Sequence, residues 1–62
     1  MNTYDIVYSI DGQPTSYLVK AWTKEHALRL FWDWYLFKGN HKSPDTLEIA
    51  QHTPYSEYEK VF

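Results

Sequence analysis

The sequence predicts an α+β fold in the order β-β-α-β, with a three-stranded antiparallel sheet, one helix packed on one of its faces and a short C-terminal appendage. Apolar and polar residues alternate over 3–11 and again over 15–22, which is the period of half-buried strands. Asp11-Gly12 between these segments is typical of a hairpin turn. Over 24–38 apolar residues recur at helical spacing instead.

The predicted hairpin has a specific register, centred on a turn at Gly12 and Gln13. Its apolar face would carry Ile10 opposite Thr15, Tyr8 opposite Tyr17, Ile6 opposite Val19 and Tyr4 opposite Ala21. Its other face would carry Val7 opposite Leu18, Thr3 opposite Trp22 and Asp5 opposite Lys20. Opposite charges directly across a strand pair stabilise it, so charge and pattern support the same hairpin.

Signals at both ends predict the helix over 24–38. The hydroxyl of Thr23 can satisfy a free amide of the first turn, and Glu25 lies where the helix dipole favours an acid. At the other end Gly39 can take the positive φ that often follows a helix, and Lys38 suits the negative end of the dipole.

A third strand is predicted over 46–51, where Leu47 and Ile49 share one side. A short helix beginning at Pro44 is the alternative, because proline is favoured in the first helical position. The segment 53–62 is expected to hold one or two helical turns, with Thr53 as N-cap.

The predicted helix has two apolar stripes. The larger contains Leu28, Phe31, Trp32, Tyr35 and Leu36. The smaller, called here the contact stripe, contains Leu30, Trp34 and Phe37, with Ala27 beside it. A three-stranded sheet has one face and can cover one stripe, so we assign the larger to the core and expect the contact stripe to bind a partner.

Two features qualify this expectation. The C-terminal segment, with Tyr55, Tyr58, Val61 and Phe62, could fold over the contact stripe instead. The outer sheet face also has apolar residues, and its secondary interface candidates are Val7, Leu18 and Trp22.

Composition bounds the class of protein. The chain has 62 residues and is expected to form one domain, 1–62, whose core is marginal by itself. It has no cysteine, so oligomerisation is the favoured source of extra stability. It has three Trp, six Tyr and three Phe, and Tyr and Trp are favoured at the centres of protein interfaces.

Charge and hydropathy bear on the partners. A net charge of -2 with scattered lysines makes nucleic acid a poor partner. No apolar run approaches the roughly 18 residues of a membrane span. The start of the chain has no basic residue, so we expect no signal peptide and a cytoplasmic location.

No motif predicts catalysis. The sequence has no phosphate-binding loop, dinucleotide fingerprint or nucleophile motif. His26, His41 and His52 have no ligand spacing and the acids are dispersed, so we expect neither a metal nor another cofactor. The expected role is binding, not enzymatic.

The helix end resembles a known family. Its residues are Asp33, Trp34, Tyr35, Leu36, Phe37, Lys38, Gly39 and Asn40. This segment resembles the helix end of the small uracil-DNA glycosylase inhibitors of Bacillus phages, which has Asp, an aromatic residue, a spacer, two apolar residues, a variable residue and Gly-Asn. Further matches are Tyr4-Asp5-Ile6, Asp11-Gly12 and Asp45-Thr46-Leu47, so the resemblance covers residues 4–51 in the same element order.

The resemblance implies a homodimer whose two helices line an apolar groove, with the host cell cytoplasm as its location. In that family the groove captures the residue that the glycosylase would insert into DNA, and flanking acids replace DNA phosphates. Trp34 matches the groove aromatic and Asp33 the acid before it. Lys38 departs from the pattern, since the family has a further aromatic there, and Phe37 can compensate. The helix is longer here, and the tail after His52 has no counterpart.

The function predicted first is therefore inhibition of uracil-DNA glycosylase by DNA mimicry. A generic protein-protein interaction module, or a phage regulator with another target, is the alternative. A third class is a nucleic-acid binder that stacks bases on Tyr and Trp of the open sheet face.

Overall fold

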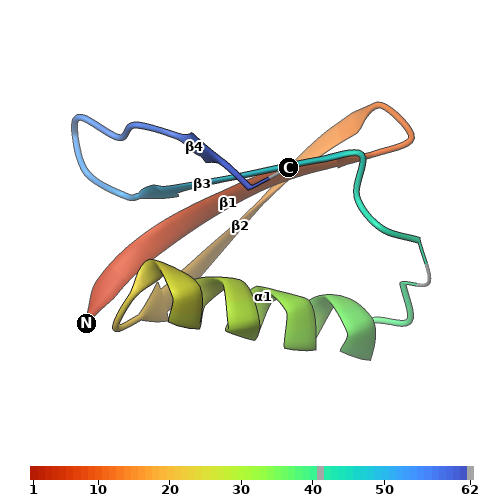
Figure 1. The fold of residues 1–62 in the computed structure, drawn as a ribbon, viewed down its shortest axis with the longest axis horizontal. Helices are drawn as coiled ribbons and strands as arrows, with labels where there is room; N and C mark the ends of the chain where they lie inside the picture. The colour runs from red at the N-terminus through yellow and green to blue at the C-terminus, as the bar shows by residue number, and fades with distance from the viewer. Residues whose placement is uncertain (41, 62) are drawn as a thin grey trace.

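A computed structural model describes residues 1–40 and 42–61. One antiparallel sheet has the strand order β2-β1-β3-β4, and α1 lies on one face of it (Figure 1). The elements are β1 (Asn2–Ile10), β2 (Gln13–Ala21), α1 (Lys24–Phe37), β3 (Thr46–Gln51) and β4 (Glu59–Lys60). The predicted α+β class and the β-β-α-β order are confirmed, and a fourth strand extends the sheet.

The β1–β2 hairpin turns one residue earlier than predicted. Its loop is Asp11-Gly12, with φ of 51° and 78°, and Ile10 pairs directly with Gln13. Two successive residues with positive φ are the requirement of a type I′ turn, and Asp-Gly is one of the pairs that meet it well. The predicted turn at Gly12 and Gln13 was wrong for that reason.

The change shifts every cross-strand partner by two positions, so side chains keep their faces but change their neighbours. Asp5 lies opposite Leu18, and Lys20 lies opposite Thr3. The predicted Asp5–Lys20 pair is therefore wrong. Trp22 follows the last residue of β2 and has no partner in this ladder.

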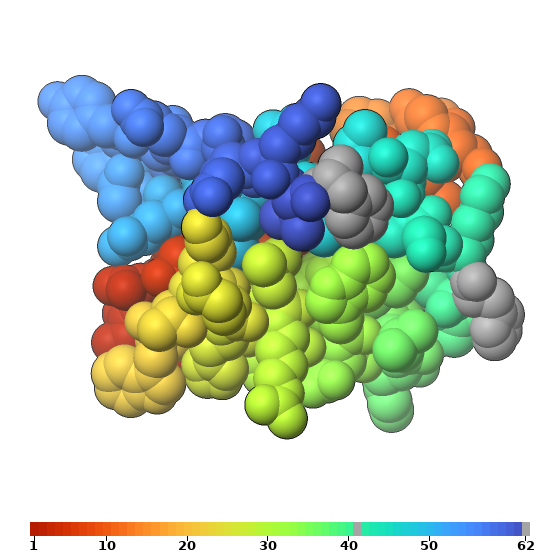
Figure 2. Space-filling view, viewed as in Figure 1, coloured from red at the N-terminus to blue at the C-terminus, as the bar shows by residue number. Residues whose placement is uncertain are grey.

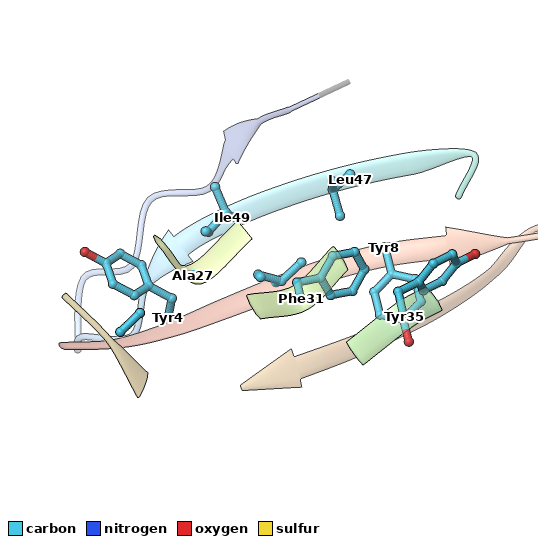
Figure 3. Packing of buried hydrophobic residues seen from close by; sticks show 9 residues of the cluster. Tyr4, Tyr8, Ala27, Phe31, Tyr35, Leu47 and Ile49 are labelled. Atoms are coloured by element: carbon cyan, nitrogen blue, oxygen red, sulfur yellow. The ribbon is translucent and has the colours of Figure 1, made fainter. Parts of the chain in front are cut away.

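The core lies between α1 and the inner face of the sheet (Figure 3). Its buried members are Tyr4, Ile6, Tyr8, Ala21, Ala27, Phe31, Tyr35, Leu47 and Ile49. The rings of Tyr8 and Phe31 meet edge to face, with centroids 5.0 Å apart. Burying a large apolar side chain contributes about 1.5–3 kcal/mol, so these rings provide much of the stability of a small domain.

The start of the helix and its caps agree with prediction, and the helix ends at Phe37, one residue before the predicted end. The Thr23 hydroxyl accepts from the amide of His26 at 3.1 Å, so Thr23 is the N-cap. At the other end the amide of Lys38 donates to the carbonyl of Trp34, and Gly39 has a φ of 84°. The positive φ of Gly39 turns the chain away from the helix axis toward β3.

The third strand is confirmed, and the alternative helix beginning at Pro44 is wrong. The amide of Asp45 donates to the carbonyl of Ser9 at 2.7 Å, which leads the chain directly into the ladder with β1. Leu47 and Ile49 then lie opposite Tyr8 and Ile6, on the inner face.

The C-terminal segment forms a strand where helical turns were expected. Glu59 and Lys60 pair with β3, while Thr53 only closes a turn in which its hydroxyl accepts from the amide of Tyr55. A short strand forms here because it pairs with backbone groups of β3 that would otherwise be left without partners. Figure 2 shows this segment, in blue, above the yellow-to-green helix, whose lower side is uncovered in that view.

Side chains of the C-terminal segment also make contacts on both faces of the sheet. The Tyr58 hydroxyl donates to the carboxylate of Asp5, on the outer face. Lys24 forms an ion pair with Glu59 near the start of α1. Because β4 lies at the β3 edge of the sheet, the tail up to Val61 lies at the opposite edge from β2. Phe62 is outside the described residues.

In the part of the chain that the structure describes, no helix has both the length and the apolar character needed to cross a bilayer.

Candidate protein-binding surface

The line of α1 that faces the sheet differs from the predicted one. Ala27, Phe31 and Tyr35 are its buried residues, spaced by one turn each. The helix thus presents to the sheet a line midway between the two predicted stripes, because one small residue and two rings fit closely against the inner face. Ala27 belongs to the core, and Leu36, assigned to the core, is 65% exposed.

The contact stripe becomes the flank of α1 that lies over β2. Leu30 and Trp34 are partly buried and pack against the core. The indole of Trp34 stacks on the ring of Tyr17, with centroids 4.4 Å apart and 23° between the planes. Phe37 continues the stripe beyond the sheet and is 88% exposed. The contact stripe therefore contains one aromatic ring held against the sheet, that of Trp34, and one exposed to solvent, that of Phe37.

Two charged residues border the contact stripe. Lys38 holds its ammonium 5.8 Å from the centroid of the Trp34 ring, within the range of a cation–π interaction. Asp33 is exposed and precedes Phe37 by one helical turn. The structure thus brings together all five residues predicted for the site, which are Leu30, Asp33, Trp34, Phe37 and Lys38.

The opposite flank of α1 contributes a surface that the sequence did not predict. A shallow hollow lies between the helix end and the following loop, lined by Trp32, Tyr35, Leu36, Asn40, Lys42 and Ser43. The Tyr35 hydroxyl donates to the carbonyl of Lys42, and the Asn40 side chain donates to the carbonyl of Tyr35. These bonds fold the loop against the helix, a contact for which the sequence holds no periodic signal.

The secondary candidates are not direct cross-strand partners of one another. Val7 is half-buried between Ser16 and Glu48, and Leu18 is 57% exposed on β2. Trp22 is 66% exposed beyond the end of β2, and its amide donates to Nδ1 of His26 at 3.2 Å. Val7 does not lie opposite Leu18 as predicted, since Asp5 takes that place.

The strand tyrosines are on the covered face of the sheet. Tyr4 and Tyr8 are buried, and Tyr17 is partly buried beneath Trp34. The outer faces of β1 and β2 therefore offer no strand aromatic ring for base stacking. A nucleic-acid binder that stacks bases there would have to use Trp22 or Tyr58, which are exposed and lie outside β1 and β2.

The titratable groups with shifted pKa values belong to structural contacts. Burial, with Tyr35 nearby, raises the pKa of Tyr8. Hydrogen-bonded carboxylates raise the pKa of Lys24, through Glu59, and of Lys42, through Asp11. Over residues 1–40 and 42–61 no three His, Asp or Glu side chains gather in a group that could hold a metal ion; His41 is outside the described residues.

Comparison with family models, curated proteins and solved structures finds no match for this chain.

Proposed function

We propose that this protein is a homodimeric inhibitor that binds the DNA-binding site of a uracil-DNA glycosylase through its contact stripe. The observation that supports it is the exposure of Phe37, which at 88% leaves a large ring in solvent next to a fixed Trp34. Exposed aromatic residues beside well-packed ones are typical of binding surfaces.

The stacking of Trp34 on Tyr17 supports binding on energetic grounds. A side chain that is already held in place loses little conformational freedom when a partner covers it. Covering Phe37 in addition would contribute about 1.5–3 kcal/mol, because a ring of that size would leave water. An apolar residue of the target could enter between these two rings.

The choice of target is supported by the resemblance of the helix end and by charge. A net charge of -2 modestly favours association with a basic DNA-binding cleft. Asp33 next to the contact stripe would meet groups that otherwise contact phosphate. Lys38 supplies the cation over Trp34 where the family has an aromatic residue. We place this activity in the cytoplasm, that of the host cell if a phage encodes the protein.

The test is a uracil-excision assay with purified glycosylase, single-stranded uracil-containing DNA and increasing inhibitor. Wild-type protein should stop excision at stoichiometric concentration, while Trp34→Ala and Phe37→Ala should each lose inhibition by at least tenfold. Leu36→Ala is the matched control, because Leu36 is exposed on the opposite flank and should inhibit like wild type. Circular dichroism checks that each variant keeps its fold. Full inhibition by both stripe variants would remove the contact stripe from the site.

A protein-binding module with another target is the second candidate, favoured by the hollow on the opposite flank of α1. Wild-type protein that leaves excision unchanged would exclude the glycosylase as target. A stoichiometric partner whose capture is lost in Leu36→Lys and kept in Phe37→Ala would then identify the hollow as the binding surface.

A further inference from the structure

The two edges of the sheet are protected very differently. The β3 edge is covered by β4, which spans Glu59–Lys60 and has charged side chains. The other edge is β2, whose nine residues, Gln13–Ala21, pair with β1 on one side only. An edge strand of that length presents a row of free backbone donors and acceptors that can pair with another strand.

The hairpin turn determines which residues of β2 direct their backbone groups outward. Because Ile10 and Gln13 close a two-residue loop, they form a hydrogen-bonded pair, and bonding then alternates along the ladder. The residues of β2 whose backbone groups point away from β1, called here outward-facing, are Pro14, Ser16, Leu18 and Lys20. Pro14 has no N–H to offer, which fits its position on an edge.

We propose that β2 pairs in antiparallel fashion with β2 of a second copy, with Leu18 on the twofold axis. This inference rests on the proposed homodimeric function and specifies its geometry. In this register Leu18 lies opposite its own symmetry mate, and Ser16 lies opposite Lys20 of the second copy. Each outward-facing residue from Ser16 to Lys20 then has a partner with both a donor and an acceptor.

Pro14 disfavours registers shifted toward the turn. An axis at Ser16 would place Pro14 opposite Leu18 of the second copy, and an axis at Tyr17 would place it opposite Lys20. Each of those pairs would lose a hydrogen bond for want of the proline N–H. With the axis at Leu18, Pro14 lies beyond the paired segment.

Lys20 disfavours registers shifted the other way. An axis at Lys20 would oppose the two ammonium groups directly, and an axis at Val19 would leave them two residues apart. With Leu18 on the axis, the two Lys20 residues are about 14 Å apart along the strands, at roughly 3.4 Å per residue. That separation exceeds the Debye length of about 8 Å at physiological ionic strength.

The same register covers an exposed apolar side chain. Leu18 is 57% exposed and lies on the outer face, opposite Asp5 of β1. On the twofold axis the two copies of Leu18 would contact each other and exclude water. Apart from Pro14, Leu18 is the one apolar residue of β2 whose backbone groups point away from β1. The proposed axis would bury its side chain.

The helix side of the dimer would form a groove. Tyr17 would lie opposite Val19 of the second copy, so these residues make its floor. Trp34 stacks on Tyr17, and the contact stripe lies on the β2 flank of the helix, so the two contact stripes would form the facing walls. A second copy therefore completes the aromatic surface on which the proposed inhibition depends.

Cysteine scanning tests the register, because the chain contains no cysteine of its own. Hydrogen-bonded antiparallel partners have Cα atoms about 5.5 Å apart, inside the roughly 4.4–6.8 Å span of disulfides. Leu18→Cys should therefore form a disulfide-linked dimer under mild oxidation. Ser16→Cys should not, since its two copies would be about 14 Å apart. Leu36→Cys controls for random collision, because Leu36 is also exposed.

Sedimentation gives the second measurement. Wild-type protein should sediment as a dimer, Leu18→Lys as a monomer with unchanged circular dichroism, and Leu36→Lys as a dimer. A monomeric wild type, a dimeric Leu18→Lys, or crosslinking of Ser16→Cys in preference to Leu18→Cys would overturn the inference. A dimer crosslinked at Leu18 that leaves uracil excision unaffected would support this geometry while rejecting the proposed target, so the two failures are distinguishable.

Discussion

The indole of Trp34 stacks on the phenol ring of Tyr17 at 4.4 Å, joining the helix to the edge strand of the sheet. The two rings come from α1 and β2, whose register and rotation must both be correct for them to meet. The contact stripe is consequently positioned by the sheet and not by the helix alone.

The stack predicts that Tyr17 affects binding by holding Trp34 in place. Tyr17→Ala should destabilise the fold by at least the 0.5–1.5 kcal/mol or so that an aromatic pair adds to burial, and should weaken inhibition because Trp34 loses its support. Tyr17→Phe keeps the ring and should behave like wild type. Urea unfolding and the excision assay measure the two effects. Equal inhibition by Tyr17→Ala and wild type would show that the stack does not position Trp34.

Two phenylalanines of α1 should differ greatly in how much stability the protein loses when each is replaced by alanine. Phe31 is fully buried between the helix and the sheet, so Phe31→Ala should cost about 3–5 kcal/mol. A domain of this size has about that much stability in total, so the variant should be largely unfolded at 25 °C. Phe37→Ala should stay within about 0.5 kcal/mol of wild type, because its ring is in solvent. Urea titration followed by circular dichroism distinguishes the two, and equal stability of both variants would contradict the assigned core.

The rotation of α1 was not predictable from periodicity. Apolar residues cover most of the helix circumference, so both the Phe31 and the Trp34 sides fit the rule that a helix buries its apolar face. Only the shape of the sheet decides, and it selects the line through Ala27 because a small residue there lets the helix approach closely. Caps are different, since Thr23 acts through its own hydroxyl and Gly39 through its own backbone, and both were predicted correctly.

The strands show the same division between local and tertiary information. Leu47 and Ile49 alternate with polar residues, so β3 was predictable with its bounds. Strand β4 contains only Glu59 and Lys60, which show no alternation and are held by backbone pairing with β3. Such a strand exists only once its neighbour is in place, so the sequence alone could not indicate it.

The hairpin turn makes a prediction about backbone strain. An added Cβ at Gly12 would meet no atom within 4 Å, but the φ of +78° is unfavourable for any residue with a side chain. Gly12→Ala should therefore destabilise the protein by about 1–2 kcal/mol without a steric clash. Asp11→Asn is the control, because asparagine tolerates the positive φ of that position. It removes the exposed ion pair with Lys42, which contributes little, so it should destabilise the protein less than Gly12→Ala does. Thermal unfolding measures both, and a Gly12→Ala variant as stable as wild type would mean that the turn adopts another type.

The contact between Tyr58 and Asp5 predicts a dependence on alkaline pH. The hydroxyl of Tyr58 donates to the carboxylate, which raises the pKa of Tyr58 above its ordinary value. A pKa raised by folding means that the contact stabilises the tail fully below about pH 10, where tyrosine is protonated in the unfolded chain as well. The stabilisation is lost as pH rises through the higher pKa of the folded state, because the phenolate can no longer donate and is repelled by Asp5.

Spectrophotometric titration at 295 nm, the phenolate band, would detect this. Wild-type protein should have one tyrosine more resistant to ionisation than Tyr58→Phe has, apart from the buried Tyr8, whose pKa is also raised. Asp5→Asn should bring the Tyr58 midpoint back toward its ordinary value, because the negative acceptor is gone while the side chain keeps its size. An unchanged titration in Asp5→Asn would mean that the hydroxyl does not donate to this carboxylate in solution.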